Sequence, residues 1–203
     1  MRLFRSPYIA RFAFRKGIWK GRDKRAIYLT FDDGPHPDVT PFVLNVLKKS
    51  SIKATFFCVG ANVEKYPQVY RQILDNGHQV GNHTMLHENG LKTPKIDYLN
   101  SVEKAATFIE SELFRPPYGK LTPFQFKYIN STFKKKVIFW TWLAYDFDAK
   151  LTGKEIIKKA ERIKGGDILV FHDSSKAQKN LEETLETIIL MLQKRNFHFN
   201  NSF

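Results

Sequence analysis

The chain has 203 residues, which is most simply one domain, and its 42% hydrophobic and 14% aromatic content excludes a disordered polymer. Lysine and arginine number 33 against 20 acidic residues, a formal net charge of +13 that favours polyanionic partners such as acidic glycans, nucleic acid or an anionic membrane face. The single cysteine, Cys58, excludes an intrachain disulfide and a cysteine-based zinc site, and its apolar neighbours predict a small core residue.

Residues 1–25 are basic and aromatic, and we expect them to form a strap that precedes a catalytic domain spanning residues 26–203. Positive charges interrupt every apolar run of this segment, so no signal-peptide core and no membrane span is visible in it. The segment would also suit contact with a membrane surface. The compartment therefore stays open among the cytoplasm, the membrane surface and the cell envelope.

Strand-like and helical segments alternate along the rest of the chain. Apolar runs predict strands at Ala26–Leu29, Ala54–Val59, His78–Gly81, Val137–Trp140 and Ile168–Phe171. Helical spacing predicts helices at Thr40–Lys49 with Thr40 as N-cap, Pro67–Asn76 ending at Gly77, Tyr98–Leu113, Glu155–Ile163 and Asn180–Arg195. This alternation is typical of a largely parallel α/β sheet closed or flanked by helices, with its active site at the carboxyl ends of the strands.

Two adjacent acids, Asp32 and Asp33, end the first predicted strand. Neighbouring strand side chains point to opposite faces, so the two acids can share one task only if the backbone turns there. The chemical interpretation is a split of roles, with one carboxylate on a metal and the other free to move a proton. The alternative is an ordinary Asp-Gly turn.

Two histidines, His83 and His87, stand four residues apart and would meet on one helix face or at a turn. Two neutral imidazoles and one carboxylate are a common ligand set for a catalytic divalent metal, whereas solvent-facing histidines are the alternative. Further along, the prolines after Arg115 stiffen the segment Arg115–Gly119, and a rigidly held arginine suits pairing with a carboxylate. The alternative is a proline-rich surface turn, which would give the same sequence pattern.

The segment Trp140–Asp148 contains both aromatic and acidic residues. Its aromatic residues, such as Trp142, would either form the floor of a sugar-binding site or belong to the core. The last predicted strand ends in His172-Asp173. A histidine there suits a general acid held by a buried carboxylate, with a structural histidine as the alternative.

Five motifs follow one another along the chain: Thr-Phe-Asp-Asp-Gly-Pro, His-Thr-x-x-His, Arg-x-Pro-Tyr-Gly, the Trp-rich segment ending in Asp, and the strand ending in His-Asp. In this order they resemble the motif series of polysaccharide deacetylases with the NodB homology domain, carbohydrate esterase family 4. The resemblance covers nearly the whole chain from Ala26 onward. It implies a distorted (β/α) barrel of seven or eight strands and a metal-dependent hydrolase that removes N-acetyl groups from a peptidoglycan- or chitin-type glycan. Ligand chemistry favours one zinc ion, while cobalt, nickel and iron also suit nitrogen and oxygen ligands.

By the same resemblance, Asp32 is the catalytic base and pairs with Arg115, while Asp33, His83 and His87 hold the metal. The resemblance also implies a substrate-binding set: Tyr118, through its backbone amide, with Pro117, Trp142 and Val170, the last lining a pocket for the acetyl methyl group.

The same resemblance makes His172 the catalytic acid and Asp146 its support. Two departures bear on that assignment: Phe147 stands where family members often have tryptophan, and Leu143 where they often have an acid. Whether Asp146 or Asp148 supports His172 therefore stays open.

Other functions remain as alternatives: a same-fold hydrolase of a cyclic amide, a non-catalytic glycan- or membrane-binding module, and a nucleic-acid binder. Every expected catalytic position is filled, which argues against a degenerate module. Only net charge favours nucleic acid, because no basic helix or aromatic RNA-binding motif is visible, and we expect no such partner. The expected protein is a monomer, and neither the glycan nor the native metal follows from the sequence.

Overall fold

The computed structural model describes residues 4–5 and 8–203. The strands are β1 (Ala26–Asp32), β2 (Thr55–Cys58), β3 (Gln79–Asn82), β4 (Leu113–Phe114), β5 (Lys136–Val137), β6 (Trp142–Leu143), β7 (Ile168–His172) and β8 (His198–Phe199). The helices are α1 (Tyr8–Ala13), α2 (Val39–Lys49), α3 (Gly60–Lys65), α4 (Pro67–Asp75), α5 (Lys95–Ala106), the 3-10 turn η1 (Pro117–Gly119), α6 (Pro123–Ser131), α7 (Gly153–Ala160) and α8 (Gln178–Lys194).

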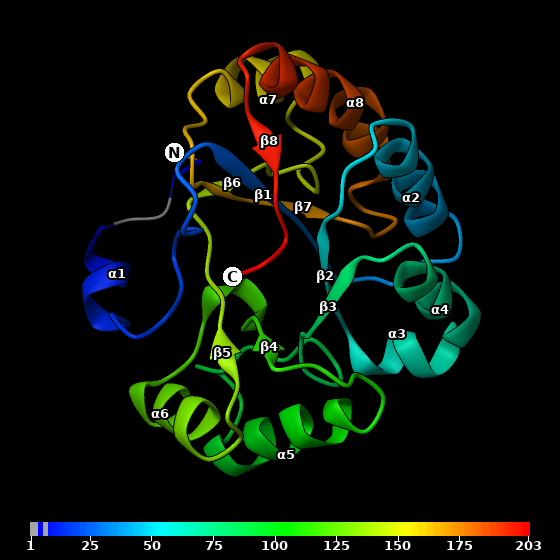
Figure 1. The fold of residues 1–203 in the computed structure, drawn as a ribbon. Coiled ribbons are helices and arrows are strands. Elements are labelled where there is room, and N and C mark those ends of the chain that lie inside the picture. Colours follow the sequence, from blue (N-terminus) through cyan, green and yellow to red (C-terminus); the bar gives the residue numbers. More distant parts are fainter. Residues whose placement is uncertain (1–3, 6–7) are drawn as a thin grey trace.

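The strands form one parallel sheet in the order β5-β4-β3-β2-β1-β7-β6, and β8 pairs with β1 beside this path. The sheet curls, and the helices surround it on the outside (Figure 1). The predicted fold, a distorted (β/α) barrel of seven or eight strands, is confirmed. Because the strands are parallel, the loops that follow their carboxyl ends meet at one mouth of the barrel.

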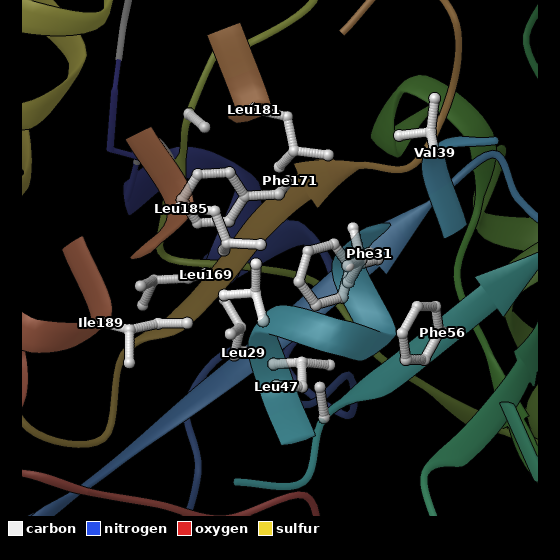
Figure 2. Close-up of a cluster of buried hydrophobic side chains, with 14 of the residues drawn as sticks. Leu29, Phe31, Val39, Leu47, Phe56, Leu169, Phe171, Leu181, Leu185 and Ile189 are labelled. Carbon is white, nitrogen blue, oxygen red and sulfur yellow. The ribbon is translucent and has the colours of Figure 1, made fainter. Parts of the chain in front are cut away.

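Strand β1 is central and buried along its whole length. Its residues alternate between two environments, as a strand requires. Leu29 and Phe31 join the main core beneath α2 and α8 (Figure 2), whereas Tyr28 packs with apolar residues of β2 and β7 on the inner face of the sheet. The alternation therefore sends Asp32 to the inner face.

The predicted strand Val137–Trp140 is wrong in extent, because strand structure is interrupted between the end of β5 at Val137 and the start of β6 at Trp142. The carbonyl oxygens of Ile138 and Phe139 accept hydrogen bonds from Arg115, at 3.3 and 3.2 Å, instead of continuing a ladder. The predicted helix Tyr98–Leu113 is also too long. It ends at Ala106, and Leu113 belongs to β4, a strand of two residues that is too short to have a periodicity of its own.

The N-terminal segment lies across the break between β5 and β6. Ile18 forms a parallel bridge with Ile138, and the ring of Trp19 stacks on Phe139 with centroids 4.1 Å apart. Arg5 pairs with the buried Asp167 at 2.7 Å. These contacts join the described part of residues 1–25 to the barrel, and the boundary at residue 25 stays a prediction. Within the described residues, no helix has the length and apolar character needed to cross a bilayer.

Candidate active site

The turn after β1 brings two carboxylates into one cavity. Asp32 is the last residue of the strand and faces inward. Asp33 adopts a φ of 81°, so the backbone leaves the strand and its carboxylate turns back toward the same space. Both acids line a cavity of about 370 Å³ at the barrel mouth. The turn, and not strand alternation, thus places both carboxylates at the same cavity.

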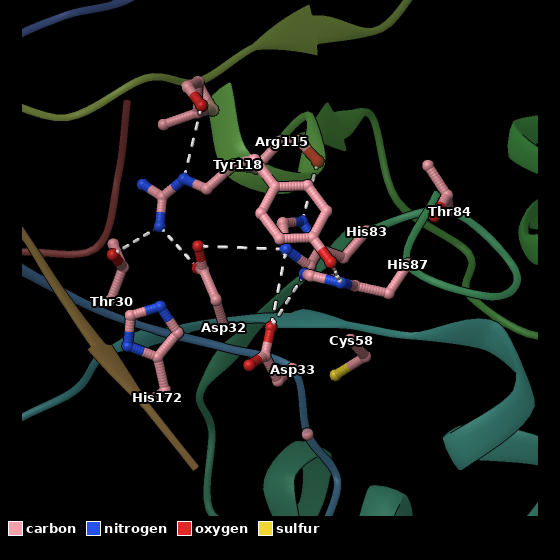
Figure 3. Close-up of polar contacts among 12 residues, drawn as sticks. Thr30, Asp32, Asp33, Cys58, His83, Thr84, His87, Arg115, Tyr118 and His172 are labelled. Atoms are coloured by element: carbon pink, nitrogen blue, oxygen red, sulfur yellow. Dashed lines mark hydrogen bonds and ion pairs between the residues drawn. The ribbon is translucent and has the colours of Figure 1, made fainter. Parts of the chain in front are cut away.

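Three side chains converge with the geometry of a metal site. Asp33, His83 and His87 each offer one ligand atom, and these atoms lie within 4.8 Å of one another (Figure 3). Oδ1 of Asp33 lies 3.8 Å from Nε2 of His83 and 3.1 Å from Nε2 of His87. That oxygen is buried and has no hydrogen-bond partner among the described residues. One carboxylate and two imidazoles fit a divalent cation such as zinc.

The protonation states of this cluster suit ligands. Burial lowers the pKa of His83 to about 4, so its ring is neutral at pH 7. Burial alone would raise the pKa of Asp33, but His87, His172 and His83 together hold it well below its usual range. A neutral imidazole and an ionised carboxylate are the forms that bind a cation.

Neighbouring groups orient both imidazoles. The chain from His83 to His87 is a turn with positive φ at Thr84 and His87, not a helix. Nδ1 of His83 lies 2.7 Å from the carbonyl oxygen of Arg115, which can only accept, so Nδ1 carries the proton and Nε2 presents its lone pair to the cluster. Nδ1 of His87 lies 3.1 Å from the hydroxyl of Tyr118.

Arg115 follows β4 and is completely buried, with its guanidinium stacked 4.0 Å from the ring centroid of Phe57. Its Nη1 donates at 2.6 Å to Oδ1 of Asp32 and at 2.6 Å to the hydroxyl of Thr30. The second oxygen of Asp32 is then left facing the cluster, 4.0 Å from Nε2 of His83. Arg115 therefore orients Asp32, the candidate base, through its guanidinium group and His83, a candidate metal ligand, through its backbone carbonyl.

His172 ends β7, the strand beside β1, and lines the same cavity. Its Nδ1 lies 2.7 Å from Oδ1 of Asp146, and its backbone N–H donates at 2.7 Å to Oδ2 of the same carboxylate. Burial lowers the pKa of His172, but the ion pair with Asp146 and the carboxylates of Asp33 and Asp32 outweigh it and raise the pKa to about 9. The ring is therefore a cation at neutral pH, with Nε2 as its remaining donor.

Asp146 rather than Asp148 contacts His172. The carboxylate of Asp148 instead accepts the backbone N–H of Lys150 at 2.9 Å. The ring of Phe147 meets the ring of His172 edge-on, with 4.9 Å between the centroids.

The expected substrate-binding residues divide into two groups. Tyr118 and Val170 line the cavity, and the side chain of Tyr118 is 59% exposed above His87. Trp142 does not line it: this residue is 1% exposed and packs against Phe171 in the core, and Trp140 is on the cavity wall instead. The prediction for Trp142 is corrected, because Trp140 lies in the break between β5 and β6, which the sequence did not reveal, whereas Trp142 begins β6. Pro117 is buried behind Tyr118 and is not among the lining residues.

The sequence analysis missed several partners that hold these groups. Thr30 shares the guanidinium of Arg115, and Asn180 on α8 donates at 2.9 Å to the carbonyl of Asp146. Thr30 opens the motif that contains Asp32, but its contact with Arg115, 85 residues away in sequence, is not evident from that motif, and Asn180 stands outside every motif. Ser174 and Lys176 complete the rim of the cavity.

Comparisons with known proteins agree with this fold and site. Residues 20–135 match the sequence profile of the family described as polysaccharide deacetylase. A peptidoglycan-N-acetylglucosamine deacetylase of Bacillus cereus is 32% identical over 184 residues, which cover 87% of this chain and 86% of that protein. A chitooligosaccharide deacetylase of Azorhizobium caulinodans is 33% identical over 159 residues, 75% of either chain. The fold and the motif residues define a barrel of the NodB type, and the chain belongs to the polysaccharide deacetylase family.

Further similar proteins include a longer deacetylase, a deacetylase of similar length and a protein described as a pseudoenzyme. PgdA, the peptidoglycan-N-acetylglucosamine deacetylase of Listeria monocytogenes, is 31% identical over 186 residues, and the match covers 89% of this chain but 38% of that protein. The crystal structure of the Bc1960 peptidoglycan N-acetylglucosamine deacetylase superposes with a TM-score of 0.86 at 26% identity, covering 96% of this chain and 94% of that one. BA3943 of Bacillus anthracis, described as a CE4 family pseudoenzyme, superposes with a TM-score of 0.79 at 26% identity and covers 90% of this chain and 66% of that one.

Proposed function

We propose that the protein is a metal-dependent N-deacetylase of an amino-sugar glycan. The observation that carries the proposal is the arrangement around Asp33. Its buried oxygen, which has no hydrogen-bond partner in the described part of the chain, meets two imidazole nitrogens beside a second acid, Asp32, that Arg115 holds. Relatives described as peptidoglycan and chitooligosaccharide deacetylases support the reaction class and the kind of glycan. Acetate and a free amine are the expected products.

Asp33, His83 and His87 would hold the cation, and zinc fits this set, with cobalt, nickel or iron as alternatives. When bound, the cation supplies Lewis-acid polarisation of the amide carbonyl and lowers the pKa of water. Asp32 takes the proton of the attacking water as general base, and Arg115 keeps its carboxylate in one orientation. The backbone amide of Tyr118 would donate to the oxygen that becomes negative in the tetrahedral intermediate.

His172 would donate a proton from Nε2 to the leaving amine, since its ring is protonated at neutral pH through the pair with Asp146. The base and the acid line the same cavity from paired positions on the neighbouring strands β1 and β7, so both would reach one substrate amide. Val170 and Leu143 supply apolar wall to this cavity, and we assign Val170 to the acetyl methyl group.

Two features favour catalysis over a non-catalytic glycan-binding module. Arg115 is buried and fully engaged around Asp32, and Asp146 holds His172 through both of its oxygens. Residues that orient another side chain, as Arg115 orients Asp32 and Asp146 orients His172, are needed to hold reacting groups in place and are not needed for binding a glycan.

The test is acetate release from a panel of N-acetylated glycans, with the protein loaded in turn with zinc, cobalt, nickel and iron. We expect acetate from peptidoglycan- or chitin-type substrates and none after chelation. The cyclic-amide alternative predicts ring opening without acetate, and a binding module predicts glycan affinity without either product.

A further inference from the structure

Asp173 is a buried acid beside the proposed catalytic histidine, yet it takes no part in holding that histidine. Both oxygens of Asp146 are used by His172, one by the ring and one by the backbone. The carboxylate of Asp173 contacts the turn that carries Asp33 instead. Its Oδ1 accepts the backbone N–H of Gly34 at 3.1 Å, and its Oδ2 accepts the hydroxyl of Thr40.

Thr40 links the carboxylate of Asp173 to His36, at the far end of the turn. Its hydroxyl oxygen accepts the backbone N–H of His36 at 2.8 Å, so Thr40 both donates and accepts. Thr40 is not the N-cap of α2 that its position predicts, since the cap is Asp38 and the Thr40 side chain is committed to this network. A threonine and an aspartate 133 residues apart in sequence thus hold the backbone N–H groups of Gly34 and His36, and Pro35 between them has none.

The carbonyl groups of the same turn are also held. The backbone N–H of Val59 donates to the carbonyl of Gly34 at 2.9 Å, and the side-chain amide of Asn62 donates to the carbonyl of Asp33 at 2.7 Å. With these contacts Asp33 keeps its φ of 81°, a conformation that a residue with a Cβ rarely adopts unless its surroundings impose it.

Close packing explains the glycine in the turn. A Cβ on Gly34 would stand 2.0 Å from Oδ2 of Asp173, which no side chain tolerates. The glycine therefore admits the carboxylate of Asp173 against the backbone, where it reaches both the N–H of residue 34 and the hydroxyl of Thr40.

We propose that Asp173 and Thr40 are positioning residues that clamp the turn 33–36 and so set where the carboxylate of Asp33 stands relative to His83 and His87. Neither residue is one of the proposed ligands or touches the expected position of the reacting amide. The consequence for turnover rests on the proposed function, whereas the consequences for the turn and for metal affinity do not need a substrate.

The test compares Thr40→Val, which removes the hydroxyl at nearly constant volume, with Thr40→Ser, which keeps it. Thr55→Val is the matched control, because Thr55 is equally buried and its hydroxyl has no hydrogen-bond partner among the described residues. The readouts are amide hydrogen exchange at Gly34 and His36, cobalt affinity followed by competition with a chelator, and kcat and KM at saturating metal.

For Thr40→Val we expect at least ~10-fold faster exchange at both amides, about 10-fold weaker cobalt binding, and a lower kcat with KM little changed, as for other groups that orient metal ligands. Thr40→Ser should restore all three values, and Thr55→Val should match the wild type. Thr40→Val that behaves like Thr55→Val in exchange and in cobalt affinity would overturn the proposal.

Two further outcomes are also decisive. If the wild type binds no metal and releases no acetate, the proposed function fails, and the exchange at Gly34 and His36 then decides the clamp alone. If Thr40→Val does not fold, hydrogen exchange in the wild type tests the clamp. The clamp predicts slow exchange at the amides of Gly34 and His36, although both lie in a loop. Exchange at these amides as fast as at exposed loop amides would contradict it.

Discussion

Replacing Asp146 by asparagine should move the alkaline limit of activity to lower pH. Burial lowers the pKa of His172, but the carboxylate of Asp146, with smaller contributions from Asp33 and Asp32, outweighs burial and raises it to about 9, against an ordinary 6.5. This difference corresponds to about 3 kcal/mol in favour of the protonated ring, at ~1.4 kcal/mol per pKa unit. Asp146→Asn removes the charge and leaves the burial, which lowers the pKa of His172.

The loss at pH 8 follows from the protonated fraction. A histidine with a pKa of about 9 is roughly 90% protonated at pH 8, and one with a pKa of 6.5 is about 3% protonated, a difference of ~30-fold in the acid form. The assay is kcat from pH 6 to 10 at saturating metal for the wild type and Asp146→Asn. Asp148→Asn is the matched control and should keep the wild-type profile. An alkaline limit that stays at the same pH in Asp146→Asn would refute the assignment of His172 as the acid held by Asp146.

The other predictions concern stability and the turn after β1. A raised folded-state pKa means that the contribution of His172 to the stability of the metal-free protein is complete below pH 6.5 and is lost as pH rises to about 9, which urea unfolding at several pH values measures. Arg115→Met leaves the buried Asp32 without its partner and should cost about 3–5 kcal/mol, or ~6–20 °C in Tm; a Tm within a degree of the wild type contradicts it. Gly34→Ala should weaken cobalt binding, since the new Cβ would displace a carboxylate. Leu185→Ala should cost about 2–5 kcal/mol through a core cavity yet leave cobalt affinity of the folded protein unchanged.

The sequence predicted the fold class and the end of the barrel that carries the site, since both follow from the alternation of elements and from motifs at strand ends. Cys58 is a buried core residue as expected, and Gly77 ends α4 with a φ of 71°. The spacing of His83 and His87 fits a helix face or a turn, and the positive φ at Thr84 and His87 makes it a turn.

What the sequence could not supply depends on contacts between distant segments. After Val137 the strand breaks, where Arg115 binds two carbonyl groups, and the tryptophan that lines the cavity is Trp140 and not Trp142. The choice of Asp146 over Asp148 depends on which carboxylate the turn presents to His172. Short strands such as β4 and β6 have two residues and therefore no periodicity to detect.

The most direct measurement is the bound metal and the acetate release of Asp32→Asn beside His83→Ala. The account predicts that Asp32→Asn keeps one bound metal per chain and loses ~10²–10⁴-fold in kcat as a general base would, while His83→Ala loses the metal. Substantial activity in Asp32→Asn, or zinc bound by His83→Ala as tightly as by the wild type, would contradict the division of the two neighbouring acids into a base and a ligand.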